Sequence, residues 1–427
     1  MDLTAEAVTW VVMAVVMTSL YVVGAATGSA EGFGVSALRN LSAAGWVAGS
    51  ALVLVAAAAA GSVGRRLRLD HRAAAPLAAA LAFPIFFLLR SNSLNPDGNG
   101  FTPKFEMDVP RLGAHVTHDE MLELLVHSRF WFYTHRWWDW TVVFSYQVLS
   151  CAAGAVFVFA LLRLARRLTP EAPALFLAGL LGGGYMQLFF GDVENYTITT
   201  ALVALYLLSA WRFLADETPL WVPAGVLGVA ISFHLVAAWL GPTLLYLCLV
   251  SRQRMGSART AWRSAALAAA IPLATAVYLQ FHGLPLVRFF SSHAGHALQP
   301  GRGMFAPGMP AAYWLDQLNL VVLLCPAVLM LIPLWYWRRI PLDQSSRFLA
   351  TAAVSTLICH ALWKSQIGVY NDWNLYAIDG LMLSVLIWRS TALAARTTMM
   401  RAAALVLAAA GWLHTYTWIV ANHAGGR

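Results

Sequence analysis

The chain has 427 residues, of which 59% are hydrophobic and 11% are charged, and its formal net charge is +8. Soluble domains carry about 25% charged residues, and a helix that crosses a bilayer needs about 20 consecutive apolar residues. Many such runs occur here, which excludes an ordinary soluble domain and predicts an all-α, polytopic transmembrane helical bundle. The long Ala, Leu and Val runs also exclude a membrane β-barrel, whose short strands alternate apolar and polar residues.

The positive net charge does not indicate a nucleic-acid partner. The basic residues form short arginine clusters between apolar runs, which is typical of the cytoplasmic loops of membrane proteins. The cysteines lie within apolar runs and predict no disulfide framework. They are Cys151, Cys248, Cys325 and Cys359. The first apolar run lacks a small-residue cleavage site, so we expect a retained helix there.

The apolar runs predict about 13 membrane helices, with a range of 11–13. They lie at about 8–28, 38–61, 74–90, 140–162, 172–190, 195–213, 220–234, 236–250, 262–281, 315–337, 347–363, 372–389 and 400–420. The run 220–250 is either one long helix or two short ones broken near His234 and Gly241-Pro242. We expect residues 1–427 to form a single integral membrane domain.

The arginine clusters decide between these topologies. If 220–250 is split, every cluster falls on one side of the membrane, whereas an unbroken helix places the later clusters opposite the earlier ones. We therefore expect two helices there, a cytoplasmic N-terminus and an external C-terminus. The clusters hold Arg65, Arg66, Arg68, Arg72, Arg163, Arg166, Arg167, Arg252, Arg254, Arg259, Arg263, Arg338, Arg339, Arg347, Arg389, Arg396 and Arg401.

The stretch from Ser91 to Trp140 is polar and acidic, although apolar runs flank it on both sides. Its acidic residues are 7 of the chain's 20: Asp97, Glu106, Asp108, Asp119, Glu120, Glu123 and Asp139. On the expected topology, 91–139 is an external loop, and 282–314 is a second one. A long polar loop between membrane helices is often functional.

The tetrapeptide Thr117-His118-Asp119-Glu120 begins a helical pattern inside the first loop. The pattern predicts an amphipathic helix in the membrane interface, with nearby tryptophans as an aromatic belt. Its apolar positions are Met121, Leu122, Leu125, Phe132 and Trp137, and its polar positions are Glu123, His127 and Arg136. Thr-x-x-Glu is a capping box, and Asp119 suits a first helical turn. Because a capped carboxylate is also rigidly placed, Asp119 and Glu120 are candidates both for capping and for catalysis.

Two further motifs place carboxylates near helix ends. Asn95-Pro96-Asp97-Gly98 is a turn signature, so Asp97 is a turn residue or a second catalytic candidate. Asp192 is a candidate helix cap, and with Glu194 it is also a candidate site for a divalent cation, Mg or Mn. Glu194 and Asn195 enter the membrane edge, where charge is costly, so we expect them to bind substrate.

Cationic residues on the external side suit a lipid-linked phosphate. His234 lies in an apolar run, Arg302 lies in the second loop, and Lys364 precedes the segment that contains Asp372. Such groups bind phosphate at a membrane surface. The alternatives are an interhelical hydrogen bond for His234 and interfacial snorkelling for the long side chains.

These motifs resemble those of the GT-C superfamily of polytopic glycosyltransferases, which use polyprenyl-phosphate sugars. Asp119-Glu120 is similar to the Asp-Glu pair that starts an interfacial helix in protein O-mannosyltransferases and the lipid A aminoarabinose transferase. The segment Phe190 to Tyr196 is similar to one in bacterial members. Asp192-x-Glu194 has the spacing of a metal-binding pair in oligosaccharyltransferases. Asp372-Trp373-Asn374-Leu375 resembles a late-helix motif.

The resemblance implies an enzyme of the bacterial cell envelope that moves a hexose or pentose, with inversion, from a polyprenyl phosphate to an acceptor hydroxyl. The acceptor would be a lipid, glycan or protein at the external side of the inner membrane. Asp119 would be the general base, Glu120 would orient the acceptor, and Asp97 would line the same pocket. The cationic residues and Asp372 would contact the donor.

Two other functions stay open from the residues alone. A transporter or flippase of a lipid-linked or small polar substrate would need ionisable residues near the middle of the membrane. A glycan polymerase or ligase shares the topology but relies more on arginines. The chain contains no Walker loop, GxGxxG, HExxH, paired CxxC or GxSxG motif, which argues against ATP-driven transport by this chain alone.

Overall fold

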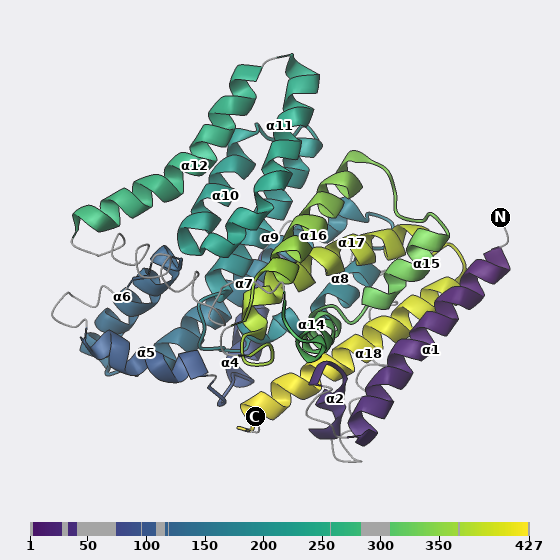
Figure 1. Ribbon diagram of the computed structural model, residues 1–427, viewed down its shortest axis with the longest axis horizontal. Coiled ribbons are helices and arrows are strands. Elements are labelled where there is room, and N and C mark those ends of the chain that lie inside the picture. The colour runs from purple at the N-terminus through teal and green to yellow at the C-terminus, as the bar shows by residue number, and fades with distance from the viewer. Residues whose placement is uncertain are drawn as a thin grey trace.

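The computed structural model describes residues 3–27, 33–40, 74–94, 96–107, 116–117, 119–256, 258–282, 308–365 and 368–425. These residues form a bundle of helices, which confirms the predicted fold class (Figure 1). The elements are α1 (Leu3–Thr27), α2 (Phe33–Ser36), η2 (Ala37–Asn40), α4 (Ala74–Leu88), α5 (Pro96–Met107), α6 (Met121–Trp138), α7 (Val142–Leu168), α8 (Pro173–Leu181), η4 (Gly184–Phe189), α9 (Thr197–Leu214), α10 (Trp221–Phe233), η5 (Leu235–Leu240), α11 (Gly241–Met255), α12 (Ala258–Phe281), α14 (Ala311–Leu324), η6 (Val328–Met330), α15 (Leu331–Tyr336), α16 (Gln344–Leu362), η7 (Trp373–Tyr376), α17 (Ala377–Ala394) and α18 (Thr398–His423).

Seven of the described helices are long and apolar enough to cross a membrane, and a bent pair makes eight. Two shorter apolar helices, Ala75–Leu88 and Trp221–Phe233, add to them. The predicted span 315–337 is this bent pair, because Ala311–Leu324 meets Val328–Tyr336 at 90°. The predicted span 38–61 lies largely outside the described residues.

The split of the run 220–250 is confirmed. The helix α10 ends at Phe233, and the backbone of His234 is extended, with φ −147° and ψ 130°. The short η5 follows, and α11 begins at Gly241 with Pro242 in its first turn. Proline is favoured there because its missing amide hydrogen has no partner within the helix.

The split brings the described arginine clusters to one end of the bundle, which we call the arginine end. Ion pairs connect its loops: Arg254 to Asp216 at 2.6 Å, Arg389 to Asp343 at 2.7 Å, Arg339 to Glu6, and Arg167 to Glu217. The N-terminus lies near this end, far from the C-terminus in Figure 1.

The centre of the bundle is α17, with 94% of its apolar window buried. Its close packing depends on Gly179 of α8, where a Cβ atom would lie 1.9 Å from the ring of Trp388. Away from the arginine end, α5 and α6 form a layer over the start of α7. The Phe101 and Tyr146 rings stack there with centroids 5.0 Å apart. This layer positions the acidic residues of the first loop.

Candidate functional site

The Asp119-Glu120 pair lies just before α6, not inside its first turn as the capping box predicts. Glu120 is the N-cap residue, and its carboxylate accepts a hydrogen bond from Thr117 Oγ1 at 3.2 Å. The carbonyl oxygen of Asp119 accepts a hydrogen bond from the Leu235 amide at 2.7 Å. The break after α10 therefore holds the start of α6, and both carboxylates sit at a fixed junction.

His234 joins this junction to the segment before α9. Its Nε2 atom lies 3.8 Å from Glu120 Oε1, and its Nδ1 atom accepts a hydrogen bond from the Val236 amide at 3.1 Å. Its ring stacks on Tyr196, with centroids 4.6 Å apart. The contact with Glu120 joins α6 to the α10 break, but its length of 3.8 Å exceeds that of the hydrogen bond in the interhelical alternative.

Tyr196 is a buried tyrosine whose pKa several nearby carboxylates raise. It is the N-cap residue of α9, just before the membrane-spanning part of that helix. Burial raises its pKa well above the usual range, and the nearby carboxylates of Asp372, Glu120, Glu194 and Asp119 raise this pKa further. We call these four residues the carboxylate end. Carboxylates from three separate parts of the chain thus act electrostatically on one buried phenol.

Glu194 and Asn195 lie just before α9, and both are buried. The Tyr146 hydroxyl donates a hydrogen bond to Asn195 Oδ1 at 2.8 Å. Asn195 therefore ties the segment before α9 to α7, which is a structural contact beside its predicted role in substrate binding. Glu194 faces the group around Tyr196.

Glu123 is a site residue that the sequence did not predict. Its side chain is fully buried, and its two oxygens accept hydrogen bonds from the amides of Ile198 and Thr199 at 2.9 and 3.0 Å. The Thr199 hydroxyl donates a third at 2.7 Å. A carboxylate at a helix N-terminus satisfies free amides and favours the helix dipole. The sequence carried only a weak signal for this cap. The residue before α9 is Tyr196, and tyrosine is not among the residues whose side chains usually cap a helix, so the cap had to come from elsewhere in the chain.

The expected orientation of α6 is corrected by this contact. Glu123 and His127, assigned to the polar face exposed to solvent, are both buried. The His127 ring stacks on Tyr146 with centroids 3.8 Å apart, and its Nε2 lies 3.7 Å from Glu123. Trp137 and Trp138 at the far end of α6 are exposed, as an interfacial belt requires. The polar face points inward because the interior it covers is itself polar.

The cap and turn predictions for two other carboxylates are wrong. Asp192 does not cap α9, since Tyr196 holds that position, and the Asp192 carbonyl accepts a hydrogen bond from Ser150 at 2.7 Å. Gly191 before it has φ +66°, where glycine is favoured. Asp97 lies in the first turn of α5 and not in a loop turn, because Pro96 begins that helix. The Asp97 side chain is outside the described part of the structure.

The phosphate-binding candidates are placed only in part. Lys364 is half-buried and follows Trp363, whose carbonyl accepts a hydrogen bond from the Tyr376 hydroxyl at 3.0 Å. Asp372 is the residue before η7, and its charge contributes to the raised pKa of Tyr196. Arg302 lies outside the described residues.

A divalent cation at Asp192 and Glu194 stays a prediction. Hard cations take about six or more oxygen ligands. In the part of the chain that the structure describes, no group of three or more His, Cys, Asp or Glu side chains could hold a metal ion. Asp192 and Glu194 alone are a small donor set, so we derive no step through a metal.

A comparison with solved structures supports the fold. The crystal structure of ArnT from Cupriavidus metallidurans bound to undecaprenyl phosphate matches with a TM-score of 0.56 and 14% sequence identity. The match covers 82% of this chain and 76% of that chain. No family model and no curated protein matches this chain. The likeness shows that this chain has a fold similar to that of ArnT.

Proposed function

We propose that this protein transfers a sugar from a polyprenyl-phosphate donor to an acceptor hydroxyl at the external side of the membrane. The observation that carries the proposal is the junction at which the His234 ring stacks on Tyr196 and lies 3.8 Å from Glu120, beside the fixed main chain of Asp119. The ArnT structure, which has the same fold, contains undecaprenyl phosphate, and we extend this class of lipid to the present chain. Clustered carboxylates suit an acceptor hydroxyl, which must lose a proton during transfer.

The proposed reaction is a single displacement at the anomeric carbon. The acceptor oxygen forms a bond to this carbon while the bond from carbon to the phosphate oxygen breaks, so the configuration inverts. Asp119 takes the proton of the acceptor hydroxyl, and the polyprenyl phosphate leaves with the electron pair of the broken bond. The main chain of Asp119 is fixed by the Leu235 amide, which supports its role as a positioned base.

Neighbouring residues have supporting roles in this proposal. Glu120 is held between Thr117 and His234 and orients the acceptor. Asp97 lines the same pocket. Lys364 and Arg302 neutralise the phosphate that leaves, because fixed cations act most strongly where charge develops. A chelator tests the metal prediction, because unchanged turnover would exclude a cation at Asp192 and Glu194.

The proposal is tested by Asp119→Asn with Asp139→Asn as the matched control. Asp139 follows α6 at its other end, its side chain is 92% exposed, and its left-handed backbone suits asparagine. With a panel of undecaprenyl-phosphate sugars, we expect Asp119→Asn to slow release of undecaprenyl phosphate by about 100-fold or more. Asp139→Asn should keep the native rate. A folded Asp119→Asn protein with full activity would exclude Asp119 as the base.

A transporter is the second candidate, and one observation favours it. His360 Nδ1 lies 3.1 Å from Asp379 Oδ2, and both side chains are buried between α16 and α17. Buried ionisable pairs of this kind serve as proton relays in transporters. His360→Gln separates the two functions: it should stop flux across proteoliposomes for a transporter, but leave a measurable transfer rate for a glycosyltransferase.

A further inference from the structure

Lys364 lies in a short segment whose main chain is held on both sides of the lysine. The carbonyl oxygen of Trp363 accepts hydrogen bonds from the hydroxyl groups of Tyr376 at 3.0 Å and Tyr313 at 3.3 Å. The amide of Ser365 donates a hydrogen bond to the Tyr313 hydroxyl at 3.3 Å. Two phenols therefore fix the peptide groups that precede and follow Lys364.

Gln317 connects these two phenols. Its Nε2 atom donates hydrogen bonds to the hydroxyl groups of Tyr313 at 2.7 Å and Tyr376 at 3.3 Å. All three side chains are buried. Each phenol thus donates to a carbonyl and accepts from an amide, which uses both functions of a hydroxyl group. We call Tyr313, Gln317 and Tyr376 the phenol clamp.

The phenol clamp connects the Lys364 segment to the carboxylate end. Tyr376 is the last residue of η7, and Asp372 directly precedes this short helix. Asp372 is one of the carboxylates whose charge contributes to the raised pKa of Tyr196. The other two members of the clamp lie on α14. The segment after α16 is therefore held by two other elements, one of which begins beside a residue of the carboxylate end.

The hydrogen bonds around the phenol clamp are not complete. Gln317 Oε1 and Ser365 Oγ are buried and have no hydrogen-bond partner among the described residues. Buried polar atoms in native proteins normally have partners, and departures from this rule are expected near functional sites. This favours a role for the clamp beyond closing the end of α16.

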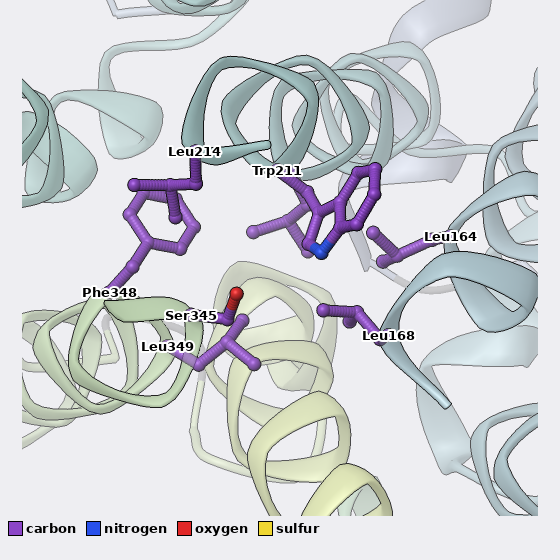
Figure 2. A pocket seen from close by; sticks show the side chains of 8 residues that line it. Leu164, Leu168, Trp211, Leu214, Ser345, Phe348 and Leu349 are labelled. Carbon is purple, nitrogen blue, oxygen red and sulfur yellow. The ribbon is translucent and has the colours of Figure 1, made fainter. Parts of the chain in front are cut away.

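The start of α16, at the arginine end, has different surroundings. Figure 2 shows its Phe348 and Leu349 side chains around a small, mostly apolar space that Trp211 of α9 also lines. The Tyr246 hydroxyl donates a hydrogen bond to the Gln344 carbonyl there at 3.2 Å. Because α16 has 19 residues, this contact lies about 28 Å along the helix from the phenol clamp. It is a phenol–carbonyl hydrogen bond of the same kind, remote from the carboxylate end.

We propose that the phenol clamp positions the Lys364 ammonium against the phosphate of the lipid donor. This role rests on the proposed function, in which Lys364 neutralises the phosphate that leaves. A lysine side chain is long and flexible, so a fixed main chain narrows the region that its ammonium can occupy. A cation held in place before the reaction stabilises the charge that develops without having to reorganise. The polyprenyl phosphate that leaves carries more negative charge than the donor, so the effect should be clear for this product.

The test measures the affinity of the full-length protein in detergent for undecaprenyl phosphate, which requires no turnover. Tyr376→Phe removes one hydroxyl of the clamp and keeps the ring, which packs against His360 with centroids 4.4 Å apart. Lys364→Gln removes the cation, and the double variant shows whether the two groups act through each other. Tyr313→Phe repeats the test from α14. Tyr246→Phe is the matched control, because it removes the phenol–carbonyl hydrogen bond at the other end of α16.

We expect Lys364→Gln to weaken binding about tenfold or more, because a charged hydrogen bond to phosphate is lost. Tyr376→Phe should weaken binding about threefold in the native background and cause no further loss in Lys364→Gln. Tyr246→Phe should keep the native affinity.

An equal loss from Tyr376→Phe in both backgrounds would overturn the proposal, since the hydroxyl would then act apart from Lys364. Native affinity in Lys364→Gln, or in both Tyr376→Phe and Tyr313→Phe, would also overturn it, as would an equal loss in Tyr246→Phe. If the losses are coupled but no sugar is transferred from any donor of the panel, the proposed function fails while the role of the clamp stands.

Discussion

The two ends of the bundle place their acidic residues in opposite surroundings. At the arginine end, Asp216, Glu217 and Asp343 each pair with a guanidinium group. At the carboxylate end, four carboxylates contribute to the raised pKa of the buried Tyr196 phenol. Paired opposite charges stabilise one another, whereas like charges in a partly buried site oppose each other.

This difference separates residues that hold the fold from residues that serve a site. Salt bridges at the arginine end connect six loops or helix ends, so their effect is structural. The carboxylate end departs from the arrangement that stability alone favours, and such departures are expected at functional sites. Glu123 is the exception there, because its partners are the amides of α9.

The largest effect on stability is expected from Glu123→Ala. This change leaves the amides of Ile198 and Thr199 without their acceptor, and each unsatisfied amide costs about 1–3 kcal/mol. The free energy of unfolding in detergent measures it. Glu171→Ala is the control, since Glu171 is exposed on a loop and should change stability by less than about 0.5 kcal/mol. A similar small change in Glu123→Ala would mean that α9 is not capped from α6.

A smaller effect is expected from Arg389→Gln at the arginine end. Arg389 is buried and donates hydrogen bonds to Asp343 and Ser346. Because water can reach the half-exposed Asp343, we expect a loss of about 1–2 kcal/mol with sugar transfer retained in the folded fraction. Arg396→Gln, an exposed arginine after α17, should be nearly neutral. A specific loss of activity in Arg389→Gln would contradict the structural role of this end.

The smallest effects are expected from pH, and they have opposite signs at the two ends. Burial raises the pKa of Tyr196 in the folded protein above its unfolded value of about 10. The Tyr196 phenol therefore stabilises the fold fully below pH about 10, and this stabilisation is lost as the pH rises through the folded-state pKa. Burial alone would raise the pKa of Asp343, but hydrogen bonds from Arg389 and the Ser346 amide lower it overall. Its contribution is present above the unfolded pKa of about 3.9 and is lost as pH falls.

Unfolding temperatures across pH would show this contrast. Tyr196→Phe should reduce the loss of stability above about pH 10 and leave the acid side unchanged. Asp343→Asn should reduce the loss on the acid side alone. If the unfolding temperature of each variant changes with pH as it does in the native protein, Tyr196 and Asp343 do not cause the pH dependence of stability.

The sequence by itself determined the helical membrane class and the break near His234. Apolar runs of this length need backbone hydrogen bonds satisfied within a helix, whatever the surroundings. The arginine clusters add a second local rule, because charged loops stay on one side. Asp119, Glu120, Glu194 and His234 were predicted from motifs that lie beside helix ends, and the structure brings them together.

Only the tertiary structure decided how those helix ends meet. Glu123 caps a helix that begins 74 residues later. Local sequence patterns do not extend over such a separation, so they could not predict this contact. Periodicity shows that α6 has a polar face, but that face can turn toward water or toward polar groups inside the protein. Here it turns inward, because the amides at the start of α9 and the ring of Tyr146 supply partners that water would otherwise provide.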